Sequence, residues 1–219
     1  FYKKRIKSGK GERKMNAIEI KNLSKSFRGM YAVDHLNMTV PVGAIYGFIG
    51  ENGSGKSTTM KLICGHLVPD SGDIQLFGKD YTDPGVRVRV GALIENAGCF
   101  PGSSVYQNLM MQCINLGIEN ADEEIHRVLE IVRMEDNANI KFKSCSLGMK
   151  QRIGIAMALL GDPALLILDE PINGLDTDGM RMMREILQDI TQKYGCTVLI
   201  SSHILGELEK IATHYGIIR

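Results

Sequence analysis

Two segments near the start of the chain alternate apolar and polar residues with the two-residue period of a half-buried strand. They span residues 17–23 and 36–40, and the pattern predicts antiparallel strands with one face on the core. A third short strand is predicted at residues 74–77, because turn-rich segments at 69–72 and 78–85 bracket it. The first part of the chain is therefore expected to contain an antiparallel sheet.

The hydrophobic pattern changes further along the chain. Runs at 165–168 and 198–200 are short, aliphatic and bounded by polar residues, which is typical of parallel strands buried on both faces. Residues 180–192 between them predict an amphipathic helix. Residues 98–160 carry many apolar positions at helical spacing. The order predicts an α/β fold with an antiparallel β subdomain and an inserted α-helical subdomain at about residues 98–160.

Composition limits the class of protein. The 219 residues are 44% hydrophobic and 23% charged, which is ordinary for a globular protein. No apolar run approaches the roughly 20 residues of a membrane-spanning helix, so any role at a membrane would need a partner protein. Five scattered cysteines lack the spacing of a metal site and are expected to be free thiols in a reducing cytoplasm.

Positive charge is concentrated at the start of the chain. Residues 1–14 contain seven Lys or Arg and one Glu, a net charge of +6, whereas the whole chain carries +1 and residues 15–219 therefore −5. The acidic remainder argues against a nucleic-acid partner. A basic arm and a translated upstream region both fit residues 1–14, and Met15 favours the second because it begins a sequence typical of a domain start. We expect 1–14 to be a basic leader outside the domain formed by 15–219, and we allow for a missing C-terminal part beyond Arg219.

The most specific motif lies at residues 50–58. It reads Gly-Glu-Asn-Gly-Ser-Gly-Lys-Ser-Thr, follows an apolar strand-like run and opens a helical one, which is the context of a phosphate-binding P-loop. Lys56 is expected to reach the β- and γ-phosphates, and the Ser57 hydroxyl to bind Mg²⁺. The residues predicted to hold the nucleotide are Glu51, Asn52, Gly53, Ser54, Gly55, Lys56, Ser57 and Thr58.

Two carboxylates follow one of the predicted buried strands. Asp169 and Glu170 come directly after the run at 165–168, and the carboxyl ends of parallel strands face the ligand crevice of an open α/β sheet. Asp169 is predicted to hold Mg²⁺, directly or through water. Glu170 is predicted to polarise the attacking water.

A further motif precedes these carboxylates. Residues 146–152 read Ser-Leu-Gly-Met-Lys-Gln-Arg, and with the P-loop and the Asp-Glu strand they make the chain after Met15 resemble the ATP-binding cassette (ABC) family. The resemblance implies a RecA-like P-loop NTPase core, an ATP cofactor, and a cassette dimer in which Ser146 and Gly148 reach the ATP held by the other copy. The departures from the usual Leu-Ser-Gly-Gly-Gln signature are Cys145 for Leu, Leu147 for the first Gly and Met149 for Gln.

The resemblance assigns other positions. Residues 173–176 resemble the D-loop, which touches its twin across the dimer, and His203 resembles the switch histidine that contacts the γ-phosphate. Phe27 lies 29 residues before Lys56, where the family places an aromatic ring on adenine; Tyr31 is the alternative aromatic.

Glu95 is the largest departure from the family pattern. It lies 39 residues after Lys56, where the family usually carries a Gln that senses Mg²⁺ and the attacking water and links the site to the membrane partner. A carboxylate only accepts hydrogen bonds and adds charge, so Glu95 is predicted to be a metal-binding and catalytic residue; a solvated loop residue is the alternative.

Glu95 and the signature variant together resemble the ATPase subunits of exporters for self-protection against bacitracin-like peptides and lantibiotics. The resemblance implies ATP hydrolysis, a membrane permease on a separate chain, and a cytoplasmic location at the inner face of the membrane. The alternatives are an importer ATPase, a soluble ABC ATPase of translation or DNA repair, and a module that binds ATP without cleaving it.

Overall fold

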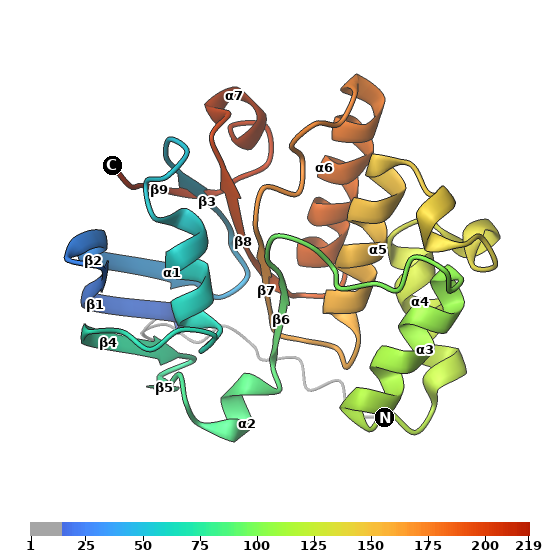
Figure 1. Ribbon diagram of the computed structural model, residues 1–219, viewed down its shortest axis with the longest axis horizontal. Coiled ribbons are helices and arrows are strands. Elements are labelled where there is room, and N and C mark those ends of the chain that lie inside the picture. Colours follow the sequence, from blue (N-terminus) through green and yellow to red (C-terminus); the bar gives the residue numbers. More distant parts are fainter. Residues whose placement is uncertain (1–14) are drawn as a thin grey trace, which may run out of the picture.

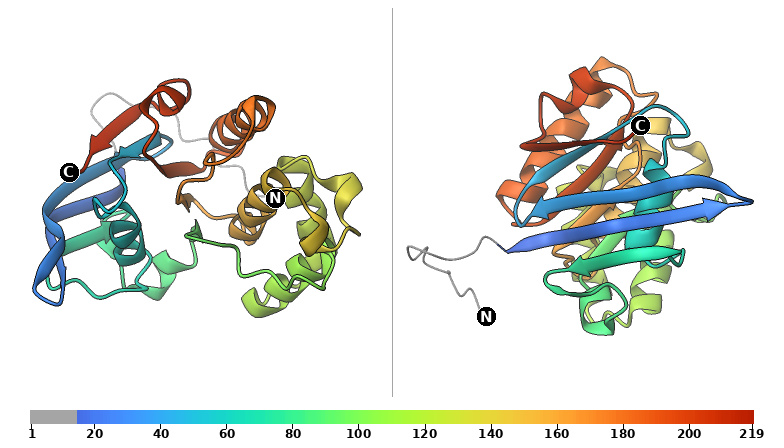
Figure 2. Two further views of the ribbon diagram at one scale, coloured as in Figure 1. Left: turned by 45° about the horizontal axis from the view of Figure 1, so that its top comes forward. Right: turned by 90° about the vertical axis from the view of Figure 1, so that its left-hand side faces the viewer.

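A computed structural model describes residues 15–219; the predicted leader at 1–14 lies outside the described residues. The described chain contains two β-sheets with a helix between them and a separate group of helices at one side (Figures 1 and 2). No helix within 15–219 has the length and apolarity needed to cross a bilayer. The five cysteines have free thiols.

The first sheet is antiparallel, as predicted. It contains β1 (Asn16–Phe27), β2 (Met30–Pro41), β4 (Ser71–Leu76) and β5 (Lys79–Asp80), in the order β2-β1-β4-β5. The first two strands are longer than their alternating segments and form one long hairpin through residues 28–29. Pairing along the hairpin supplies backbone hydrogen bonds even where the side-chain pattern is irregular.

The second sheet is entirely parallel. Its order is β6 (Val90–Leu93), β7 (Leu165–Leu168), β8 (Thr197–Ser202), β3 (Ile45–Ile49) and β9 (His214–Ile217). Strands distant in sequence thus become neighbours. The carboxyl ends of β7, β8 and β3 lie side by side, so the segments that follow these strands meet at one edge of the sheet.

The helix α1 (Lys56–Ile63) lies between the two sheets, while α6 (Thr177–Gln192) covers the opposite face of the parallel sheet (Figure 1). Side chains of the central strands alternate between these two cores because successive residues of a strand point to opposite faces. Leu165 and Ile167 pack in the core with α1, whereas Leu166 and Leu168 pack in the core with α6. This double burial explains the continuous apolar run of β7.

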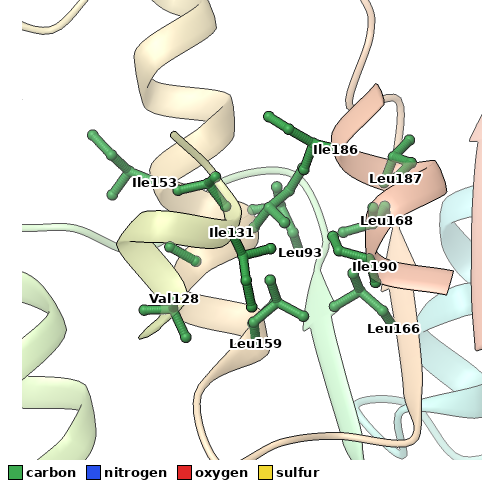
Figure 3. Close-up of a cluster of buried hydrophobic side chains, with 14 of the residues drawn as sticks. Leu93, Val128, Ile131, Ile153, Leu159, Leu166, Leu168, Ile186, Leu187 and Ile190 are labelled. Carbon is green, nitrogen blue, oxygen red and sulfur yellow. The ribbon is translucent and has the colours of Figure 1, made fainter. Parts of the chain in front are cut away.

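The inserted region between β6 and β7 is helical, with α3 (Val105–Leu116), α4 (Ala121–Ile131) and α5 (Leu147–Leu159). Its apolar faces share one core with α6 and the adjoining strands (Figure 3). Figure 3 shows Val128, Ile153 and Ile186, from three different helices, at that junction. The remaining short elements are 3₁₀ turns at Glu135–Asn137 and Phe142–Ser144, α2 (Pro84–Arg87) and α7 (Leu205–Leu208).

Candidate functional site

The segment between β3 and α1 forms an open anion cradle at the edge where strands end. Its last glycine, Gly55, is the N-cap of α1 with φ +99°, and a Cβ there would lie 2.1 Å from the Ala32 carbonyl oxygen. Only glycine fits both constraints. The helix start has no side-chain cap and no acidic residue in its first turn, so its N–H groups and positive dipole end are available to an anion.

Lys56 lies within this cradle and is only 6% exposed. Its Nζ donates to the carbonyl oxygens of Gly50 (2.8 Å) and Glu51 (3.0 Å). The same Nζ is 3.5 Å from Oε1 of Glu170. The ammonium has three donors, so two of them fix the loop and one faces the carboxylate. A buried ammonium group in this position is suited to bind an anionic ligand.

Asp169 and Glu170 follow β7, and a residue of the neighbouring strand holds both. The buried Ser201 hydroxyl in β8 donates to Oδ1 of Asp169 (2.6 Å) and accepts the Glu170 backbone N–H (2.9 Å). Nothing in the sequence pattern assigned Ser201 a role of its own. The only sequence signal was its place two residues before His203, since its partners come from a segment more than 30 residues away.

Glu170 is constrained in both its backbone and its side chain. Its backbone has φ +49°, which is uncommon outside glycine and is found where surrounding contacts enforce it. Its Oε2 lies 2.9 Å from Nδ1 of His203. Its Oε1 is buried without a hydrogen-bond partner, as is the Ser54 hydroxyl oxygen of the cradle.

These features fit a nucleoside triphosphate. Ser57, Thr58 and Glu170 line one hollow of about 200 Å³ together with the cradle. The open helix start and Lys56 can bind phosphate oxygens, and the buried Ser54 hydroxyl, which has no hydrogen-bond partner, can donate to one. Ser57 and Asp169 supply hard oxygen atoms of the kind Mg²⁺ prefers.

Glu95 occupies a different environment from that predicted for a metal ligand. Its side chain is 63% exposed, and Oε1 pairs with Nζ of Lys61 at 2.5 Å. Among residues 15–219, no three His, Cys, Asp or Glu side chains gather closely enough to hold a metal. Glu95 therefore follows the strand β6, which pairs with β7, but its carboxylate is paired with Lys61 of α1. The sequence pattern had assigned Lys61 no role.

The signature residues lie apart from the cradle. Ser146 is the N-cap of α5, and its hydroxyl accepts the Met149 backbone N–H at 3.2 Å. Ser146 and Gly148 line a separate hollow of about 410 Å³ with Gly174 and neighbouring D-loop residues. The structure thus places the predicted nucleotide residues in two groups on one chain: the cradle with the carboxylates, and the signature with the D-loop.

Leu147, which replaces a glycine of the usual signature, is 50% exposed and contacts the D-loop at Gly174. A Cβ added to Gly174 would lie 3.0 Å from its Cδ2, and one added to Gly148 would lie 3.6 Å from Cδ2 of Leu175. Each leucine therefore contacts a glycine of the other segment. This contact directs the Leu147 side chain toward its own D-loop.

The two candidate aromatic residues lie near the tip of the β1–β2 hairpin, and both are largely exposed. Phe27 is 45% exposed and Tyr31 65%. Phe27 pairs with Met30, and Ser26 pairs with Tyr31 on the next rung, so Phe27 and Tyr31 are on opposite faces of the hairpin. Ala32, the residue after Tyr31, contacts the cradle at Gly55.

The parallel sheet, the glycine-lined cradle and the adjoining carboxylates define a P-loop NTPase. The model of the ABC transporter family matches residues 33–173, and the chain belongs to this family as an ATP-binding ATPase domain. The prediction made from the P-loop, the Asp-Glu strand and the signature is thereby confirmed.

Two relatives illustrate the similarity. The chain is 41% identical over 203 residues to the bacitracin transport ATP-binding protein BcrA of Bacillus licheniformis, covering 92% of this chain and 66% of that protein. It is 39% identical over 201 residues to the lantibiotic transport ATP-binding protein SrtF of Streptococcus pyogenes, covering 92% and 86%. The chain thus spans about two thirds of the length of the bacitracin relative.

A solved structure gives the same fold. That of cbiO1 from Clostridium perfringens, part of the ABC transporter complex cbiONQ, superposes with a TM-score of 0.84 at 26% identity, over 94% of this chain and 85% of that one. The predicted α/β fold with an antiparallel sheet beside a parallel P-loop core is confirmed.

Proposed function

We propose that this chain is the ATP-hydrolysing subunit of an exporter that moves a peptide antibiotic or a similar substrate through a permease on a separate chain. The identity of about 40% with bacitracin and lantibiotic transport ATP-binding proteins supports the peptide substrate. The proposal of ATP hydrolysis rests on the geometry of Glu170. One of its carboxylate oxygens is held by His203, and the other is buried without a hydrogen bond.

In this proposal, the cradle and Lys56 hold the triphosphate while Glu170 acts on water. Oε1 of Glu170, which faces Lys56 without a hydrogen bond, would orient the attacking water in line and accept its proton as the water oxygen bonds to the γ-phosphorus and the bond to ADP breaks. His203 keeps the carboxylate in that orientation. Mg²⁺, bound through Ser57 and Asp169, would offset charge on the phosphate oxygens. Catalysis comes mainly from positioning and electrostatic stabilisation.

The second half of the site is proposed to come from another cassette, identical or homologous. Ser146 and Gly148 line a hollow separate from the cradle, yet the start of α5 carries a hydroxyl and free N–H groups suited to a phosphate. A second copy facing the cradle would bring these groups to the nucleotide, with Phe27 beside the base.

The permease is proposed to bind this chain from the cytoplasmic side, through the loop at 95–104 and the helical subdomain. The loop connects β6, whose end lies beside Asp169, to the start of α3. Movement of the site on ATP binding would reach the permease through this connection. Residues 15–219 would act as one ATPase domain.

The test begins with nucleotide binding. Lys56→Ala should abolish tight binding of a fluorescent ATP analogue, because the cradle loses its cation and two loop contacts; unchanged affinity would contradict the proposed site. Copurification with a permease encoded beside the chain, followed by ATPase assays with added peptides, tests export. Stimulation by a solute-binding protein instead would indicate an importer.

A further inference from the structure

The ion pair between Lys61 and Glu95 joins two elements of the nucleotide site. Lys61 is in α1, and Glu95 follows β6 by two residues. Their side chains meet at 2.5 Å, between Nζ and Oε1. The two residues are 34 positions apart in sequence, with the antiparallel strands β4 and β5 between them, so the pair exists only because the fold places α1 beside the end of β6.

Each partner of the ion pair lies on a segment that contains or contacts a proposed metal-binding residue. Lys61 is four residues after Ser57 on the same helix, which places the two on one face a single turn apart. On the other side, the carbonyl oxygen of Leu93 accepts the Asp169 backbone N–H at 2.9 Å. The pair thus links the helix that carries Ser57 to the strand end beside Asp169.

The Lys61–Glu95 ion pair is weak enough for a ligand that binds the Glu95 carboxylate more strongly to replace it. The side chains are 31% and 63% exposed, and exposed ion pairs contribute little stability because water solvates both charges. The Glu95 backbone has φ +67°, a conformation that a residue with a Cβ adopts at some cost. The ion pair with Lys61 is therefore a weak restraint on the position of the Glu95 carboxylate.

We propose that Lys61 is a positioning residue for Glu95: it competes with bound metal–nucleotide for the Glu95 carboxylate and holds this group aside until the complex arrives. The inference rests on the proposed function, because it assigns the released carboxylate to the Mg²⁺ side of the site. Lys61 thereby sets the Mg²⁺ concentration at which nucleotide binding is half-maximal.

The experiment measures binding of a fluorescent ATP analogue across a Mg²⁺ titration, beside the Mg²⁺ dependence of ATP hydrolysis. The forms compared are the unaltered chain, Lys61→Met, Lys61→Arg, Glu95→Gln and the Lys61→Met/Glu95→Gln double variant. Lys79→Met is the control, since it removes a lysine from another exposed pair, with Asp83 at 3.6 Å. Melting curves without nucleotide verify that each form is folded.

Lys61→Met should lower the Mg²⁺ midpoint by up to about fivefold, the equivalent of one exposed ion pair. Lys61→Arg and Lys79→Met should leave the midpoint unchanged, and Lys61→Met should have no effect once Glu95 is Gln. An equal shift with and without Glu95, or no shift at all, overturns the inference and leaves the proposed function standing. Failure of the unaltered chain to bind the analogue overturns both.

Discussion

The Nδ1 atom of His203 lies 2.9 Å from Oε2 of Glu170. A carboxylate can only accept, so the histidine nitrogen is the donor. The two residues follow neighbouring parallel strands, β7 and β8, and Ser201 fixes the backbone of Glu170 from the same strand that leads to His203. One carboxylate oxygen is thus immobilised and the other is left buried, facing Lys56.

Glu170→Gln should retain nucleotide binding and lose turnover. The amide keeps the shape of the side chain but is not a base, so ATP hydrolysis should fall at least about 100-fold. The slowly cleaved ATP should accumulate in a dimer, measurable by size-exclusion chromatography with Mg²⁺ and ATP. Continued hydrolysis at the original rate would assign the base to another residue.

Ser201→Ala should impair the site through both carboxylates. The substitution removes the donor to Asp169 and the acceptor for the Glu170 N–H, leaving buried groups unpaired at a cost of about 1–3 kcal/mol. We expect weaker binding of Mg²⁺, seen as a higher Mg²⁺ concentration for half-maximal activity, and a lower kcat, both measured by steady-state ATPase assays. Ser202→Ala is the matched control, because that hydroxyl instead accepts the Ile204 N–H; equal losses in the two variants would argue against a specific role for Ser201.

Gly174→Ala should disrupt the contact between the signature segment and the D-loop. The new Cβ would be 3.0 Å from Leu147 at a backbone φ of +74°. Gly195→Ala controls for backbone strain alone, since φ there is +70° and nothing lies within 4 Å. Hydrolysis should fall more in Gly174→Ala than in the control, and Leu147→Ala should restore part of it. Equal rates of hydrolysis in the two glycine variants would show that the contact between Gly174 and Leu147 does not affect activity.

Phe27→Ala should weaken ATP binding by about 10- to 100-fold, the equivalent of losing one base-stacking ring. Tyr31→Ala should have little effect, because Tyr31 is on the other face of the hairpin. Binding of ATP and of inorganic triphosphate is compared in both variants by calorimetry. Loss of ATP affinity in Tyr31→Ala alone would indicate that Tyr31, and not Phe27, stacks on the adenine.

Glu124→Gln should destabilise the helical subdomain. The carboxylate accepts from Arg127 in two hydrogen bonds and from the Gly161 N–H at 2.8 Å, joining α4 to the end of α5. The Arg127 guanidinium holds the pKa of this carboxyl below its ordinary value of 4.5. We expect a loss of about 1–2 kcal/mol at neutral pH, or a few degrees in Tm.

The pH dependence of that loss follows from the lowered pKa. A carboxylate with a lower pKa in the folded state contributes stability above its unfolded value, and this contribution disappears as pH falls through the folded value. The Tm difference between the unaltered chain and Glu124→Gln should therefore shrink as pH falls below about 4.5. Glu123→Gln, which alters an exposed carboxylate of the same helix, should show neither effect.

Local sequence was sufficient to identify the cradle, the signature helix and the buried strand β7. The glycines of 50–58 impose a turn that other residues cannot adopt, and Ser146 caps a helix through a neighbour three residues away. Each of these features depends on contacts within a few residues. The strand β6 was not recognised, because its four residues Val90–Leu93 include a glycine and an exposed alanine and give no clear period.

The amino-acid sequence by itself therefore determined the fold class, the glycine-lined cradle and the pair of carboxylates, since backbone geometry and hydrophobic period encode them locally. Only the tertiary structure decided which groups those carboxylates contact. Ser201 on Asp169, Lys56 facing Glu170, and Lys61 on Glu95 all join segments that are distant in sequence and that the fold brings together. Charge pairs and hydrogen bonds act over a few ångströms in space, and the distance along the chain carries no information about them.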